Sequence, residues 1–261
     1  MSQQILETQH RYSGSGLTHC TGATLLSSVL LLGTLLQGCG TAGTRQAESP
    51  KNEVAVLRYE VREPGRDKAY VSEILVSKTR MVMWEPGNAK DFLMFDRQSQ
   101  TIYSVTSDDQ TVFVIKAKPV AGEPPMALEN VEVSQPSSAM PKIQNMPATH
   151  YRYDVNGKHC YDVVSLPENF LPDVRQALVE YRTVLAGEHA AGLANSPKDQ
   201  LQACDLSINI FHPVKHLQHG VPIREWDRKG KQRFMVDFRE KWLADMSRFD
   251  LPQGYQHYSI Y

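Results

Sequence analysis

The chain has 261 residues, of which 41% are hydrophobic, and its 28 basic and 29 acidic side chains give a net charge of −1. This length can bury one sizeable core. The balanced charge argues against a nucleic-acid partner, which would require a basic excess or stripe. With 22% charged residues and ordinary Gly and Pro counts, the composition also excludes wholesale disorder and collagen-like structure.

An apolar run covers residues 23–36. It is too short to span a bilayer core, but it suits the apolar part of a secretory signal; the alternative is a buried core helix. The next residues, Leu36-Gln37-Gly38-Cys39, resemble the lipobox of bacterial lipoproteins. That resemblance implies a signal peptide over residues 1–38, cleavage before Cys39, and attachment of lipid to the Cys39 sulfur.

Two acyl chains at Cys39 would hold the mature protein on a membrane without spanning it. Gly40 rather than Asp follows the cysteine. By resemblance to the sorting rules of enteric bacteria, this predicts anchoring at the outer membrane, facing the periplasm. Residues 39–52 are small and polar, and we expect a flexible tether there; an ordered edge segment is the alternative.

Four cysteines are present: Cys20, Cys39, Cys160 and Cys204. Removal of the signal and lipidation would leave Cys160 and Cys204 as an even pair in an oxidising compartment. We predict a disulfide between them, which would stabilise the fold by about 4 kcal/mol in the chain-entropy model. The alternative is two reduced cysteines in the core.

Residues 53–261 are predicted to form a single β-rich domain. Alternating apolar residues separated by turn signals indicate a meander of short antiparallel strands. The strands are expected over residues 54–61, 70–84 (two strands, broken near Ser77-Lys78), 92–95, 101–105 and 111–115, with a further short one around residues 131–133.

Asn156-Gly157 is the best local signal, because these residues supply the positive φ of a two-residue hairpin between residues 151–155 and 158–164. A helix is predicted to begin at Pro172 and to end near Gly187 or Gly192, within a helical insertion of about residues 171–203. A last hairpin joins residues 221–226 to 233–238. The predicted fold class is α+β, with an antiparallel curled sheet and a helical insertion.

The order of these parts is similar to that of the lipoprotein-carrier family (LolA/LolB-like). The most specific pieces are Gly220-Val221-Pro222-Ile223 and Phe249-Asp-Leu-Pro-Gln-Gly-Tyr255. The resemblance implies an incomplete β-barrel around helices, with an apolar hollow that shelters acyl chains, and hence a lipid or lipoprotein as ligand.

Three histidines lie close together at His212, His216 and His219. On one helix, the first two could chelate a metal, but Pro213 and Gly220 disturb the segment, and we expect a solvated histidine-rich loop instead. His159 and Cys160 are neighbours on a strand and point to opposite faces, so they do not form a base and a nucleophile. No catalytic motif and no cofactor motif is recognised.

Five aromatic residues could line a ligand hollow or could simply belong to the core: Phe92, Phe95, Tyr103, Phe113 and Trp226. The sequence therefore favours a non-enzymatic, lipid-anchored envelope protein that shelters a hydrophobic ligand or acyl chain. The alternatives are an envelope structural or assembly protein with a filled core, and an unrecognised hydrolase. An open apolar cavity would favour the first.

Overall fold

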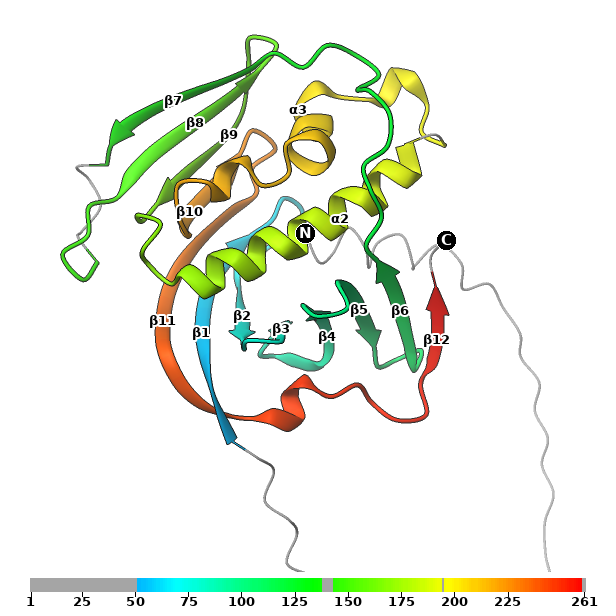
Figure 1. The fold of residues 1–261 in the computed structure, drawn as a ribbon. Helices are drawn as coiled ribbons and strands as arrows, with labels where there is room; N and C mark the ends of the chain where they lie inside the picture. Colours follow the sequence, from blue (N-terminus) through cyan, green and yellow to red (C-terminus); the bar gives the residue numbers. More distant parts are fainter. Residues whose placement is uncertain (1–50, 138–142, 194, 260–261) are drawn as a thin grey trace, which may run out of the picture. The chain divides into compact units, whose positions relative to one another are not determined.

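A computed structural model describes residues 51–137, 143–193 and 195–259 (Figure 1). The predicted signal peptide, Cys39 and most of the predicted tether lie outside the described residues. The first strand begins at Lys51, so the last two residues of the expected tether, Lys51 and Asn52, belong to a strand.

Twelve strands form one open, mostly antiparallel sheet in the order β12-β6-β5-β4-β3-β2-β1-β11-β10-β9-β8-β7. Among the described pairs, only β12 with β6 is parallel. The strands are β1 (Lys51–Arg62), β2 (Tyr70–Val76), β3 (Arg80–Glu85), β4 (Asn88–Asp96), β5 (Thr101–Thr106), β6 (Thr111–Lys116), β7 (Asn130–Pro136), β8 (Thr149–Val155), β9 (Lys158–Ser165), β10 (Pro222–Asp227), β11 (Gln232–Asp245) and β12 (Gln256–Ser259).

The turn signals of the sequence place the strand ends. The Ser77 hydroxyl accepts from the backbone N–H of Arg80 at 2.9 Å, which separates β2 from β3 at the predicted break. Asp96 likewise accepts from the backbone N–H of Ser99 at 2.9 Å between β4 and β5. Asn156 and Gly157 have φ values of 51° and 69°, as the predicted hairpin requires.

The long helix α2 (Pro172–Leu193) begins at the predicted proline and buries a stripe of residues at helical spacing: Val174, Leu178, Tyr181 and Leu185. Of the two expected ends, Gly187 and Gly192, the second is confirmed, because the helix runs to Leu193. A Cβ at Gly187 would lie 2.1 Å from the Lys118 carbonyl oxygen, so this glycine allows close packing rather than ending the helix. The other helical segments are η1 (Lys198–Gln200), α3 (Ala203–Leu206), η2 (Ser207–Phe211), η3 (Lys215–Leu217) and η4 (Met246–Phe249).

Both faces of the β1–β6 part of the sheet are covered. On the helix face, the Phe95 ring meets the Tyr181 ring of α2 edge-on, with centroids 5.9 Å apart. On the opposite face, Leu75, Val82 and Met94 pack with Phe249 of η4. Figure 1 shows α2 on one side of β2–β5 and the red C-terminal segment on the other.

We call residues 246–255, which join β11 to β12, the strap. Leu251 and Tyr255 of the strap pack against Val105 and Val112 of the sheet. The sequence did not indicate β12, the four-residue strand that follows the strap. Within the described ranges, no helix is long and apolar enough to cross a membrane.

Candidate functional site

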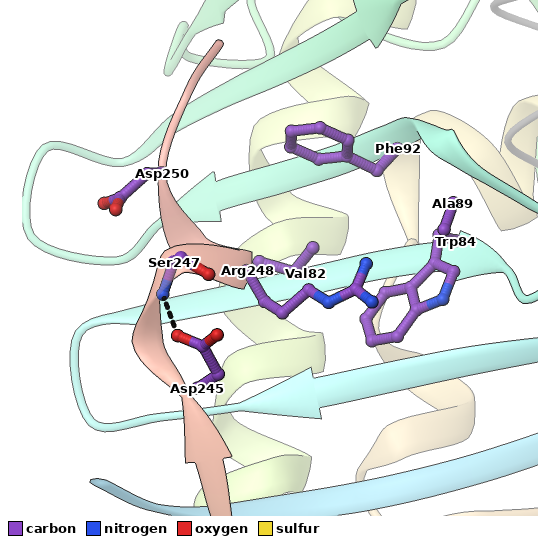
Figure 2. Close-up of a pocket in the computed structure, with 8 residues that line it drawn as sticks. All are labelled: Val82, Trp84, Ala89, Phe92, Asp245, Ser247, Arg248 and Asp250. Carbon is purple, nitrogen blue, oxygen red and sulfur yellow. Dashed lines mark hydrogen bonds between the residues drawn. The ribbon is translucent and has the colours of Figure 1, made fainter. Parts of the chain in front are cut away.

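A pocket of about 370 Å³ lies between the strap and strands β3 and β4 (Figure 2). Its lining comprises Val82, Trp84, Ala89, Phe92, Asp245, Ser247, Arg248 and Asp250. This volume is at the lower end of the range for small-molecule sites. The pocket is on the strap face, opposite to α2.

The apolar wall of the pocket comes from the sheet. Val82 and Trp84 are two residues apart in β3 and therefore share a face. Phe92 in β4 pairs in register with Trp84, which brings the two aromatic side chains to the same side of neighbouring strands. The local sequence thus builds an aromatic surface at one end of the strap.

The polar wall comes from the strap and the end of β11. The Asp245 carboxylate accepts from the Ser247 backbone N–H at 2.9 Å, the bond drawn in Figure 2. The Arg248 guanidinium lies over the Trp84 ring, 5.8 Å from its centroid. Arg248 shares the pocket lining with two carboxylates, those of Asp245 and Asp250.

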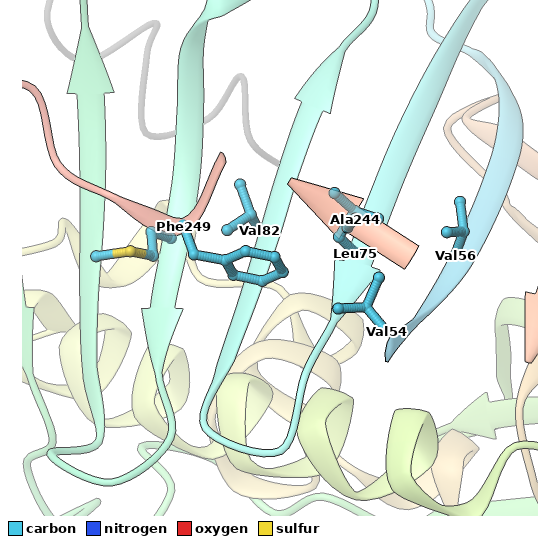
Figure 3. Packing of buried hydrophobic residues seen from close by; sticks show 7 residues of the cluster. Val54, Val56, Leu75, Val82, Ala244 and Phe249 are labelled. Atoms are coloured by element: carbon cyan, nitrogen blue, oxygen red, sulfur yellow. The ribbon is translucent and has the colours of Figure 1, made fainter. Parts of the chain in front are cut away.

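Two contacts hold the strap in place. Arg80 Nη1 donates to the Phe249 carbonyl oxygen at 2.7 Å and lies 3.6 Å from the Asp250 carboxylate. The Phe249 side chain is fully buried against Val82, and Figure 3 shows it seated on the sheet beside Leu75 and Ala244. The pocket is therefore bounded by a fixed segment.

The structure does not bring the five predicted ligand-lining aromatics together. Phe92 lines the pocket, and Tyr103 packs next to it on the same face. Phe95 is buried on the helix face against Tyr181. Phe113 stacks on Tyr258 of β12, and Trp226 stacks on His150 with ring centroids 5.3 Å apart.

The sequence analysis missed Trp84 and Arg248. Trp84 could have been found, because it lies two residues after Val82 in the same predicted strand and therefore on the same face. Arg248 could not, because only the course of the strap brings it to β3.

The predicted disulfide is present. Cys160 of β9 and Cys204 of α3 are bonded, with their Cα atoms 5.4 Å apart. Both cysteines are buried, together with Val155 and the partly buried Leu128 and Ile208. The bond fixes the short helix α3 to the sheet.

The expectation of a solvated histidine-rich loop is wrong for His216, which is buried, whereas His212 is exposed. His212 Nδ1 lies 3.4 Å from the Ser207 hydroxyl, and His219 stacks on Tyr151 with centroids 4.1 Å apart. Each histidine thus has a different partner. No group of three or more His, Cys, Asp or Glu in the described ranges is placed to hold a metal ion.

A cluster of charged groups lies between the sheet and α2. Arg233 of β11 binds Glu225 of β10 with Nη2–Oε2 and Nε–Oε2 distances of 2.5 and 2.6 Å. His216 Nε2 lies 3.8 Å from the other carboxylate oxygen. Arg182 of α2 is buried and donates to the Ile208 and Pro213 carbonyl oxygens at 2.8 and 3.2 Å.

The charges in this cluster shift one another's ionisation. Burial alone would raise the pKa of the Glu225 carboxyl, but the positive charges of Arg233 and Arg182 outweigh it and keep that pKa below its ordinary value. Burial, and then Arg182, lower the pKa of His216 to about 3, so this imidazole is neutral. The Glu225 carboxylate is thus paired with a guanidinium, and the Arg182 guanidinium is satisfied by carbonyl oxygens. Charges that are paired within the protein in this way are typical of a structural network.

The fold and site together define an open, mostly antiparallel sheet with a helix across one face and a ligand-sized pocket on the other. A scan against protein-family models and a search among curated proteins gave no match. Among solved structures, the chain is similar to PNGF-II in space group C2 (TM-score 0.38, 11% identity), covering 80% of this chain but only 31% of PNGF-II. It is also similar to an uncharacterised conserved protein from Thermus thermophilus (TM-score 0.38, 10% identity), covering 79% of this chain and 90% of that one. At these TM-scores, the matches carry no information on family or function.

Proposed function

We propose that this chain is a non-enzymatic, lipid-anchored protein of the cell envelope that shelters a small amphipathic ligand, such as a fatty acyl chain with a charged head. The observation that carries the proposal is the pocket under the strap. One wall offers Trp84 and Phe92 to an apolar tail. The other carries the Arg248 guanidinium for an anionic head, next to the Asp245 and Asp250 carboxylates, of which Asp250 is paired with Arg80.

The location is proposed on the lipobox resemblance of residues 36–39, with the outer membrane as the site and the membrane lipid as the first partner. The open sheet with α2 across one face supports a finer interpretation of the fold as an incomplete β-barrel of the lipoprotein-carrier kind. In that family, the hollow lies around the helices. Here Tyr181 and Phe95 occupy the space between α2 and the sheet, so we place the ligand on the strap face instead.

The same packing favours a second candidate function. An assembly or structural lipoprotein needs no ligand cavity, and the buried stripe of α2 gives the helix face the filled core that such a protein would have. The two functions differ in whether the strap pocket takes up a molecule.

We propose no catalytic role. The eight residues that line the pocket include no histidine, cysteine or lysine. The bond between Ser247 and Asp245 uses the serine backbone N–H.

Decanoate is a suitable probe for the pocket, because it combines a short tail with one carboxylate. We expect its binding to change the fluorescence of Trp84, and we expect Arg248→Met to weaken binding about tenfold, since it removes a charge-assisted contact. Trp226→Phe is the matched control and should leave the signal unchanged. Native mass spectrometry that finds no bound decanoate and no co-purified lipid would favour the assembly function.

The anchor is tested separately by labelling with radioactive palmitate. We expect the full chain to take up the label and to fractionate with membranes, and we expect Cys39→Ser to abolish the label. An unlabelled wild-type chain would overturn the lipid anchor but not the pocket.

A further inference from the structure

One end of the β1–β11 pair extends beyond its neighbours. Strand β2 pairs with β1 only from Ala55 onward, and β10 pairs with β11 only over Gln232–Phe234. In the described sheet, Lys51–Val54 therefore pair only with Trp242–Asp245. We call this two-stranded end the ribbon tip.

The ribbon tip exposes two large apolar side chains on opposite sides. Trp242 is 45% exposed and pairs with Val54, while Leu243 is 63% exposed and pairs with Glu53. Consecutive residues of a strand point to opposite faces, so the two side chains cannot both be covered by one flat surface. The Arg239 guanidinium lies over the Trp242 ring at 4.3 Å from its centroid.

The ribbon tip is also where the described chain starts. Lys51 follows Cys39 by twelve positions in the sequence, a stretch that reaches about 40 Å when fully extended and about 20 Å as a flexible coil. If Cys39 carries lipid, this end of the sheet is held close to the bilayer at a high effective concentration.

We propose that the ribbon tip docks into the bilayer surface that holds the chain's own lipid anchor, with Trp242 and Leu243 entering the interfacial layer. This inference rests on the proposed lipidation of Cys39. A lipid interface can take up Trp242 and Leu243 although they lie on different sides of the ribbon. On the Trp242 side, Val54 and Ala244 are buried in one cluster with Phe249, so only the outer part of that side is open to lipid. Tryptophan prefers this layer, because its ring is apolar and its N–H is polar.

The charges around the ribbon tip specify the kind of bilayer. The basic side chains of Lys51, Arg239 and Lys241 are balanced by the acidic side chains of Glu53, Glu240 and Asp245. Lys241 Nζ lies 3.9 Å from the Glu53 carboxylate. We therefore expect docking to need no anionic lipid and to occur on zwitterionic phosphatidylcholine.

The test uses the full chain, expressed with its leader in bacteria, purified in its lipidated form and inserted into phosphatidylcholine vesicles with brominated acyl chains. The chain has three tryptophans, so Trp84→Phe/Trp226→Phe leaves Trp242 as the reporter. We expect its emission to shift to the blue and to be quenched about twofold by the brominated chains. Leu243→Ser should reduce the quenching. In the matched control, Trp84→Phe/Trp242→Phe, the remaining Trp226 should stay unquenched.

The possible failures are distinguishable. Vesicle-bound protein whose Trp242 is quenched no more than Trp226 would overturn the docking and leave the anchor intact. Protein that carries no lipid and does not float with vesicles would overturn the anchor. A blue shift that grows with protein concentration without lipid would assign the ribbon tip to a contact between two copies and overturn the docking.

Discussion

Arg182 is a buried cation that donates hydrogen bonds to main-chain carbonyl groups. Its guanidinium satisfies the Ile208 carbonyl at the irregular helix η2 and the Pro213 carbonyl in the following turn. Buried carbonyl groups need such donors, because an unpaired one costs free energy. A single side chain on α2 thereby fixes a segment with little regular structure of its own.

Replacing Arg182 with Met keeps most of the volume but removes the donors. We expect the free energy of unfolding to fall by about 3 kcal/mol. Two carbonyl groups lose their hydrogen-bond donor, and the Glu225 carboxylate loses a nearby positive charge. Urea denaturation measures this change. Arg62→Met, at an exposed arginine on β1, is the control, and an equal loss in both variants would contradict the role of Arg182.

His216 makes stability depend on pH. Its pKa in the folded chain is about 3, below the ordinary 6.5, so between these values the unfolded chain binds a proton that the folded chain does not. The contribution of His216 to the free energy of unfolding is therefore complete at pH values above 6.5. It is lost as the pH falls from there toward the pKa of about 3 in the folded chain. The slope reaches at most about 1.4 kcal/mol per pH unit.

The variant His216→Gln should reduce this slope. We expect the loss of unfolding free energy between about pH 7 and about pH 5 to be smaller in the variant than in the wild type, as measured by urea denaturation. His189 and His212, whose pKa values are also lowered by burial, remain in both proteins and leave a residual slope. Identical slopes would show that His216 is protonated in the folded chain.

At the scale of elements, the strap acts as the second cover of the sheet. Its η4 turn places Phe249 against Val82, Leu75 and Met94, while Arg80 holds the backbone of the same residue. The strap therefore has two roles: it covers the apolar face of β2–β4, and it forms one side of the pocket.

Phe249→Ala should test both roles. We expect a loss of about 4 kcal/mol in unfolding free energy, because a fully buried ring leaves a cavity, and a loss of decanoate binding. Phe249→Leu should cost less than about 1.5 kcal/mol and keep the binding. Unchanged decanoate binding in the alanine variant would show that the pocket does not depend on the position of the strap.

The disulfide joins α3 to β9 across a sequence separation of 44 residues. The double variant Cys160→Ala/Cys204→Ala should lose about 4 kcal/mol of stability in the chain-entropy model. Hydrogen exchange should rise first in α3 and η2, which the bond fixes to the sheet. If the variant instead exchanged faster than the wild type by the same factor in every segment, the disulfide would act through the unfolded state alone.

At the scale of the whole molecule, local patterns predicted most of the sheet. The breaks at Ser77, Asp96 and Asn156 are encoded by side chains that bond to nearby backbone or tolerate positive φ, so they can be recognised without tertiary information. Of the two glycines at which the helix was expected to end, Gly192 lies next to the actual end at Leu193, whereas Gly187 permits close packing; the two kinds of glycine look alike until Lys118 is placed.

The candidate site was less predictable than the fold. Phe92 was identified from its type, but the pocket depends on the strap crossing β3 and β4, and that course is set by contacts such as Arg80 to Phe249. His216 was also misjudged, because it is buried and its ring packs edge-on against Tyr161 of β9, a segment remote in the sequence. Pairing between remote segments, not local pattern, decided both outcomes.

The pairing of β1 with β11 sets the order in which the chain can mature. Leu57, in the first strand, pairs with Phe238, about 180 positions later. During synthesis, β1 can pair with β2 early, whereas β11 becomes available only after all the intervening segments have emerged. Such remote pairing is entropically costly and slow to form.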